Sequence, residues 1–137
     1  MNIIQITSLA NKMVMRNIKL RLRHFGCNHN LSTVQVMILV NINEGVNGVN
    51  IISKELLLTR QAVHQVVHKM IEIGYLRLVR SDRDKRFKAI EFTDKGCYYA
   101  YITELIIDDT EDFMSLMLGD EKMCLLKDVL NTIIVPK

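Results

Sequence analysis

Apolar residues recur along most of this chain with helical spacing. Over residues 3–25 they follow one another at steps of three, four or five positions, which predicts a helix with one apolar stripe. Ser32 is a good N-cap for a second predicted helix at residues 33–42. Two further helices are predicted at residues 51–57 and 60–73, the second with Thr59 as its N-cap. A long helix is predicted after Thr93, which caps it, with Asp94 in its first turn. After a break at Gly119-Asp120, a last helix is predicted at residues 121–134.

A different pattern interrupts these helices between Gly74 and Thr93. Residues 76–79 and 87–92 alternate apolar and polar side chains, as half-buried strands do. Gly74 stands where a left-handed residue commonly ends a helix, and the loop at residues 80–86 is almost wholly charged. Two helices joined by a short turn and followed by a β-hairpin predict a winged helix-turn-helix, so we expect a mainly α fold with a two-stranded wing.

Composition narrows the class of protein. The chain has 137 residues, the usual size of one domain, and 49% of them are hydrophobic, which excludes general disorder. No uncharged apolar run reaches the roughly 18 residues of a membrane span, and the first residues do not resemble a signal peptide. Three widely spaced cysteines without a CxxC pair do not form a disulfide scaffold, and they fit a reducing compartment. We therefore expect a cytoplasmic protein without a membrane partner.

Charge is unevenly distributed, although the formal net charge is only +3. No acidic residue precedes Glu44, so the first third is basic, whereas the last third is acidic. Residues 77–88 carry six lysines and arginines against two aspartates. The basic first third and acidic last third can be ordinary solvated helix faces, but a basic hairpin tip favours a nucleic-acid partner.

The predicted helix at residues 60–73 has the character of a DNA recognition helix. Its apolar residues face one way, and its outward row holds no acidic side chain before Glu72. Arginine reads guanine and glutamine reads adenine at the major-groove edge, and the helix start can hold a phosphate. The alternative, an amphipathic helix with a polar face, is less favoured beside a wing. The predicted DNA-binding residues of this helix are Thr59, Arg60, Gln61, His64, Gln65, His68 and Lys69.

The hairpin tip supplies a second predicted DNA contact. Arginine and lysine at such a tip can enter a minor groove, whose negative potential attracts them. An aspartate there can stiffen the turn by pairing with an arginine; otherwise the tip is a solvated hairpin with self-neutralising charges. The predicted wing residues are Arg83, Asp84, Lys85 and Arg86.

Three stretches resemble the MarR (multiple antibiotic resistance regulator) family of winged helix-turn-helix transcription factors. LSTVQ at residues 31–35 is similar to the opening of that family's second helix. ISKEL at 52–56 through IEIGYL at 71–76 resembles its helix-turn-helix, and DKR at 84–86 with FTDKG at 92–96 resembles its wing. The chain departs from the family at Ser32, in the KELLL run and at Ala62-Val63-His64, which bears on the operator that is read.

The resemblance implies a single domain over residues 1–137, with dimerisation helices at 1–30 and 94–137 and a winged helix-turn-helix lobe at 31–93. It implies a homodimer that binds double-stranded DNA at a pseudo-palindromic operator. We expect a repressor, although no residue fixes the sense of regulation. A small-molecule effector between the dimerisation helices and the lobe is a further partner that the resemblance implies.

Other chemistry is weakly indicated. His24, Cys27 and His29 lie within six residues, but their spacing matches no metal motif, so we expect no metal and no cofactor. Cys27 is a low-ranked redox candidate, while Cys97 and Cys124 are expected in the core. His64 and His68 have metal-binding helical spacing, but groove contact is favoured for them.

No catalytic motif occurs, so we expect no enzyme. Acids such as Asp108 and Asp112 are interpreted as a solvated face or as a contact with a partner's basic first helix.

Two alternatives remain open at this stage. In the first, the winged fold is a protein-interaction module whose charged tip contacts protein. In the second, a metal- or redox-responsive switch is built on the same fold. Weak, salt-insensitive DNA binding would favour the first, and retained zinc or a reactive Cys27 would favour the second.

Overall fold

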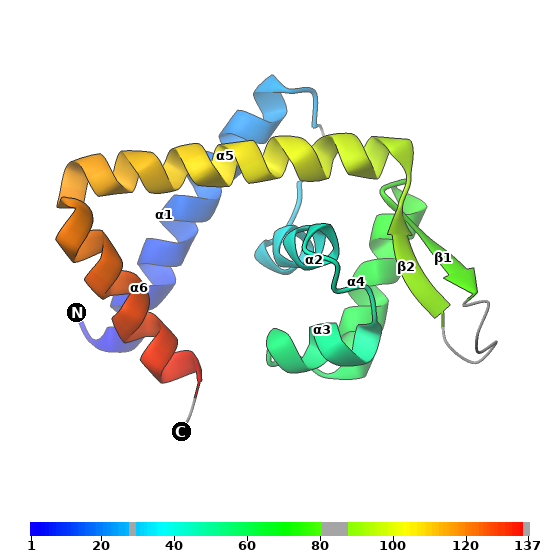
Figure 1. Cartoon of the computed structure of the whole chain (residues 1–137), viewed down its shortest axis with the longest axis horizontal. Helices are drawn as coiled ribbons and strands as arrows, with labels where there is room; N and C mark the ends of the chain where they lie inside the picture. The colour runs from blue at the N-terminus through cyan, green and yellow to red at the C-terminus, as the bar shows by residue number, and fades with distance from the viewer. Residues whose placement is uncertain (28–29, 81–87, 136–137) are drawn as a thin grey trace.

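The computed structural model describes residues 1–27, 30–80 and 88–135, except for the side chain of Lys88. Within these ranges, α5 is a long helix that α1 crosses, with α6 at one end of it and the wing at the other (Figure 1). The elements are α1 (Ile3–His24), α2 (Thr33–Asn43), α3 (Val49–Glu55), α4 (Arg60–Glu72), β1 (Leu76–Arg80), β2 (Lys88–Phe92), α5 (Asp94–Leu118) and α6 (Asp120–Ile134).

The helix boundaries follow from local capping. Ser32 and Gln35 form a capping box in which each side chain bonds the other residue's backbone N–H, as predicted for the start of α2. Thr59 Oγ1 accepts a hydrogen bond from the Ala62 N–H at 3.1 Å and so fixes the start of α4. Gly74 has a φ of +87°, which confirms the predicted left-handed end of α4. The third helix runs from Val49 to Glu55 rather than over the predicted residues 51–57, and Gly48 occupies its N-cap position.

The winged lobe has a continuous core. Val63, Val67 and Met70 of α4 are buried against residues of α2 and α3, among them the fully buried Leu39 and Ile52. These side chains recur at helical spacing, so one face of each helix is removed from water. The lobe therefore holds α4 with its apolar face inward and its polar face outward.

The wing is an antiparallel pair in which Leu76 lies opposite Phe92 and Arg80 opposite Lys88. The Ile90 N–H donates to the Asn47 carbonyl at 3.1 Å, so the turn after α2 extends the sheet by one backbone contact. On the exposed side of the sheet, Arg77 pairs with Glu91. The charged hairpin is thus fixed to the lobe at its base.

The start of α5 closes tightly on the turn between α4 and β1. Thr93 donates from its hydroxyl to the Gly74 carbonyl and from its backbone N–H to the Tyr75 carbonyl. Gly96 is buried there, and a Cβ at this position would lie 1.9 Å from the Tyr75 carbonyl oxygen. Only glycine permits this approach, so the TDKG sequence joins the wing, α4 and α5.

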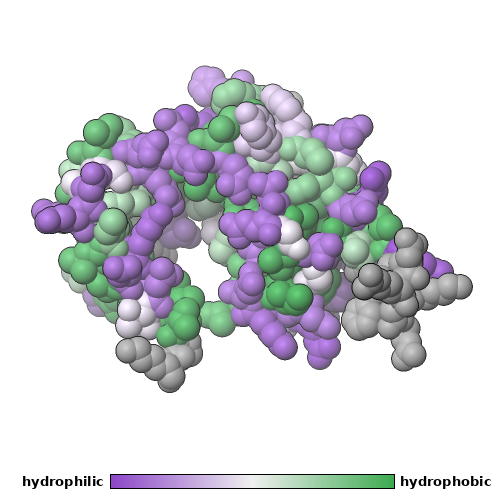
Figure 2. Space-filling view, viewed as in Figure 1, coloured by the Kyte–Doolittle hydropathy of each residue, from purple (hydrophilic) through white to green (hydrophobic). Residues whose placement is uncertain are grey.

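The start of α1, the end of α5 and α6 leave more large apolar side chains exposed than the core of the lobe does. Met15, Ile18 and Leu22 of α1 pack inward, but the first half of the predicted α1 stripe is exposed. Met123 alone is buried within α6, all of which is described. Hydrophobic residues reach the surface over α6 and the neighbouring end of α5 in Figure 2, where an open gap separates α6 from the lobe.

The expected core positions of two cysteines are wrong. Cys97 and Cys124 are both exposed, because each lies on the outward side of its helix. Cys27 is the buried cysteine. Within the described ranges, no helix is both long and apolar enough to cross a membrane.

Candidate nucleic-acid interface

The outward face of α4 is a row of exposed polar and basic side chains. The structure brings every α4 residue predicted to contact DNA onto this face, and the buried residues occupy the opposite side. Because the helix is anchored through Val63, Val67 and Met70, its outer side chains stand clear of the core. The exposed row is Arg60, Gln61, His64, Gln65, His68 and Lys69.

The beginning of α4 adjoins a cleft of about 510 Å³ formed with α3. Lys54 and Arg60 supply two cations to its lining, and Asn50 and Thr59 supply polar atoms. At the start of a helix, backbone N–H groups point outward and the helix dipole favours an anion. The cleft is thus suited to a phosphate group beside the recognition helix.

Three polar residues of this cleft were missed in the sequence. Asn50 and Lys54 belong to α3, and their polar character alone does not distinguish them from solvated positions. The available signal was the short turn to α4, which brings the end of α3 beside the α4 start. Ser53, also missed, is buried and donates to the Asn50 carbonyl at 2.8 Å, so its role is structural.

A buried polar contact sets α3 against α2. Asn41 Nδ2 donates to Glu55 Oε2 at 3.0 Å, and Asn41 is only 8% exposed. A buried amide requires a partner, so this bond fixes where α3 lies on α2. It thereby fixes the cleft between α3 and α4.

The predicted wing contacts Arg83, Asp84, Lys85 and Arg86 lie outside the described residues. The strands on either side of them are described: β1 ends at Arg80, β2 begins at Lys88, and these two residues are paired in the sheet. The wing residues therefore stay predictions.

The low-ranked metal and redox residues are not assembled into a site by the described structure. His24 is exposed at the end of α1, and His29 lies outside the described residues. No group of three or more metal-ligating side chains occurs among the residues whose placement is given. Cys27 is buried, with its Sγ 3.2 Å from Tyr75 Oη, and burial is the main cause that raises the pKa of the Tyr75 phenol. Cys27 thus packs the end of α1 onto the α4–β1 turn.

A family model describes part of this architecture. Residues 29–86, which include α2, α3, α4 and β1, match the model of the MarR family. No curated protein matches the chain.

Solved structures share the fold over nearly the whole length. A MarR-family transcriptional regulator from Rhodococcus sp. RHA1 is 19% identical, with a TM-score of 0.72 over 96% of this chain and 91% of that one. A mutant MarR from E. coli, complexed with operator DNA, is 14% identical, with a TM-score of 0.77 over 96% and 92%. CouR from Rhodococcus jostii RHA1, bound to p-coumaroyl-CoA, is 19% identical, with a TM-score of 0.76 over 96% and 91%.

By the match over residues 29–86 and by the shared fold, the chain is similar to the MarR family. The resemblance in the three sequence stretches is thereby confirmed, as is the mainly α winged fold. At these identities the solved structures establish the fold and not the ligand, so the partners of this chain are proposed from its own residues.

Proposed function

We propose that this chain is a sequence-specific DNA-binding transcriptional regulator of the MarR family that acts as a homodimeric repressor. The observation that carries the proposal is the exposed face of α4, where six polar or basic residues precede the first acid, Glu72. Arg60, Gln61 and Gln65 have the donors and acceptors that read base edges. The α3–α4 cleft with Lys54 adds a phosphate site that sets the register on the duplex.

The homodimer follows from apolar surface that the single chain leaves in water. Large hydrophobic side chains are exposed at the start of α1, at the end of α5 and along α6, a surface that marks a protein interface. A two-fold dimer presents two α4 helices, so its operator is a pseudo-palindrome with half-sites roughly one helical turn apart. The exposed residues are Ile3, Ile4, Ile6, Leu9, Met13, Phe113, Leu116, Met117, Leu125, Leu126, Val129, Leu130, Ile133 and Ile134.

The proposed division of the chain follows from the difference between the polar face of α4 and the exposed apolar surface of α1, α5 and α6. Residues 31–93 form the DNA-binding lobe, and residues 1–30 and 94–137 form the dimerisation helices of the same domain. The proposed wing contacts, Arg83 to Arg86, reach phosphate or the minor groove from β1 and β2. This division assigns recognition and assembly to different elements.

Selection from a random duplex pool, followed by fluorescence anisotropy at two salt concentrations, tests the proposal. We expect enrichment of a two-fold symmetric motif, and Gln61→Ala or His64→Ala should change the preferred bases. Asn131→Ala, a polar change on α6 away from α4, should leave the motif as it is. Enrichment of no motif, or salt-insensitive binding beside a stable protein complex, would replace this proposal with the interaction module.

The wing requires its own variant. Arg86→Ala should weaken binding to all duplexes and reduce the salt slope by about one unit, because it removes one phosphate contact without base readout. Unchanged affinity at both low and high salt would remove Arg86 from the interface.

A further inference from the structure

A single asparagine-glycine pair, Asn47-Gly48, lies in the turn between α2 and α3. The Asn47 side chain is exposed, and its amide forms no hydrogen bond with any residue whose placement is given. The Gly48 backbone N–H also has no hydrogen-bond acceptor within the described ranges. A deamidation joins the side-chain amide carbon to the next backbone nitrogen, and here both groups are free of competing bonds.

Gly48 leaves the space that this reaction needs. Its φ of −105° and ψ of 135° are extended, and a Cβ at this position would have no heavy atom within 4 Å. Because glycine carries no Cβ beside the attacking nitrogen, ring closure onto the Asn47 side chain meets the least steric resistance. The same geometry means that alanine can occupy position 48 without strain.

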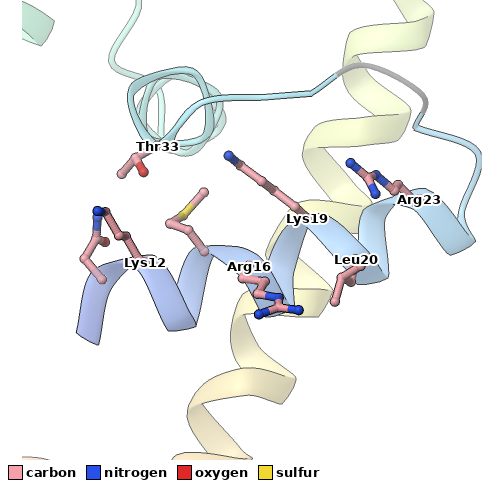
Figure 3. Close-up of a pocket in the computed structure, with 8 residues that line it drawn as sticks. Lys12, Arg16, Lys19, Leu20, Arg23 and Thr33 are labelled. Carbon is pink, nitrogen blue, oxygen red and sulfur yellow. The ribbon is translucent and has the colours of Figure 1, made fainter. Parts of the chain in front are cut away.

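Asn11 shows the contrast within α1. It lines the cleft in Figure 3, where the next residue, Lys12, carries a long side chain on the side of α1 that faces Thr33. The backbone N–H of Lys12 is engaged in the hydrogen-bond ladder of the helix. Asn50 lies in α3 and precedes the β-branched Ile51, which crowds the attacking nitrogen. Neither asparagine combines an open neighbour with an unbonded nitrogen.

The Asn47 backbone attaches the wing to the lobe. Its carbonyl oxygen accepts a hydrogen bond from the N–H of the buried Ile90 of β2 at 3.1 Å. On either side of the Asn47-Gly48 pair, Val46 and Val49 pack against the core and fix the ends of this short segment. A backbone that is lengthened between these two fixed residues displaces the Asn47 carbonyl from Ile90.

We propose that Asn47 deamidates spontaneously and that the product loosens the wing from the lobe. The Gly48 nitrogen bonds to Cγ of Asn47, the Cγ–Nδ2 bond breaks, and the amide nitrogen leaves as ammonia with the Gly48 proton. Water then opens the cyclic imide at either of its carbonyl carbons. Cleavage at Cγ gives aspartate, whereas cleavage at the backbone carbon gives isoaspartate, whose main chain runs through Cβ and Cγ and is longer by one atom. Either product carries a carboxylate that is ionised at neutral pH.

Incubation of the full-length protein in mildly alkaline buffer, followed by tandem mass spectrometry of its peptides, tests the reaction. Asn47 should gain the mass of an amide-to-carboxylate exchange at least about tenfold faster than Asn11 or Asn50 of the same molecule. Its rate should rise with pH, because the Gly48 nitrogen attacks after losing its proton. The variant Gly48→Ala should deamidate at least about tenfold more slowly, since its Cβ crowds the attacking nitrogen.

Hydrogen exchange of the Ile90 amide, followed by NMR, measures the attachment of the wing. In incubated wild type this amide should exchange at least about tenfold faster than in fresh protein, because its acceptor has moved. Incubated Gly48→Ala is the matched control and should keep the exchange rate of fresh protein. Asn47→Asp adds the carboxylate without lengthening the main chain, so its Ile90 amide should also stay protected.

Three results would overturn this inference. Equal conversion of Asn47, Asn11 and Asn50 would mean that the turn does not favour the reaction. Equal conversion of wild type and Gly48→Ala would mean that the Gly48 nitrogen is not the attacking group. Unchanged exchange of the Ile90 amide in fully converted protein would mean that the wing stays attached.

An effect on operator binding rests on the proposed function, whereas the reaction and the loosening of the wing do not. Converted wild type should bind the selected operator at least about threefold more weakly than fresh protein, because the wing is displaced and a negative charge is added. Incubated Gly48→Ala should keep its affinity. If no preparation binds any duplex while Asn47 still converts, the regulator proposal fails and the modification site stands. If fresh and converted protein bind the operator equally, the effect on DNA binding is overturned.

Discussion

Similar apolar residues are buried in the winged lobe and exposed in α6. In the lobe, Val63, Met70 and Tyr75 are completely buried by their own chain. In α6, Leu125 is 61% and Ile133 is 67% exposed, and the apolar face finds no cover within the described chain. Burial of such side chains stabilises each by about 1.5–3 kcal/mol, so the lobe is stabilised by contacts within the chain, including those with α1 and α5, whereas α6 gains little from its exposed apolar residues. The difference supports the proposal that α6 takes part in the dimer interface, whereas the lobe does not.

The largest expected effect comes from placing charge on the apolar side of α6. Leu130→Glu combined with Ile133→Glu should abolish the dimer, because buried carboxylates without partners are strongly disfavoured. Operator affinity should fall by at least about 100-fold, since each α4 then binds one half-site without the effective concentration that the second provides. Light scattering gives the mass, for which wild type should show twice the 15.9 kDa of one chain.

The control adds one negative charge to the polar side of α6, where the double variant adds two to its apolar side. Asn131→Glu is exposed and lies between the two substituted positions, so it should leave the dimer mass and operator affinity unchanged. A dimeric Leu130→Glu, Ile133→Glu variant would show that α6 does not form the interface. Loss of the near-ultraviolet circular dichroism would show that the two substitutions unfold the chain rather than only separate the protomers.

The next effect concerns the junction between the two regions. Gly96→Ala should lower the free energy of unfolding by about 3 kcal/mol, because the new Cβ meets the Tyr75 carbonyl oxygen, which cannot move as a flexible side chain can. Alanine's higher helix propensity offsets only about 1 kcal/mol. Urea denaturation measures the change, and Cys97→Ala at the exposed neighbouring position should be close to neutral. Equal midpoints for the two variants would contradict the close approach of α5 to the α4–β1 turn.

Local signals were sufficient for most of this architecture. Ser32, Thr59 and Thr93 each cap a helix as predicted, because capping depends on a few adjacent residues. The pairing of α1 with α5 could not be predicted, since the partner of Arg21 lies 88 positions along the chain. Cys97 and Cys124 were misplaced because an apolar neighbourhood in sequence does not say which side of a helix faces inward.

The candidate site was predictable to a similar extent. The polar face of α4 follows from helical periodicity, and its exposure in the structure agrees with that pattern. Asn50 and Lys54 join it only because the chain turns sharply after α3. The basic character of α1 could be read from sequence, but the pairing of Arg21 with Asp109 of α5 required the structure.

A smaller effect is expected at the first turn of the recognition helix. Thr59→Ala should lower the free energy of unfolding by about 1 kcal/mol, because the Ala62 N–H loses its side-chain acceptor. Thr59→Ser keeps the hydroxyl and should restore most of that loss in the same denaturation experiment. If serine and alanine destabilise equally, the threonine methyl group rather than the cap stabilises this end of the lobe.

The smallest expected effect lies in the turn between α3 and α4. Leu57 has a φ of +56° and is 74% exposed, so its side chain contributes little packing while its backbone holds a left-handed conformation. Such a conformation costs a non-glycine residue roughly 1–2 kcal/mol, whereas glycine adopts it freely but is more flexible when unfolded. Leu57→Gly should therefore stabilise the lobe by about 0.5–1 kcal/mol in urea denaturation, and Leu57→Ala, which keeps the strain, should not. Equal stabilities of the glycine and alanine variants would mean that the turn relaxes in solution, and the α3–α4 cleft would then be formed only when DNA holds it.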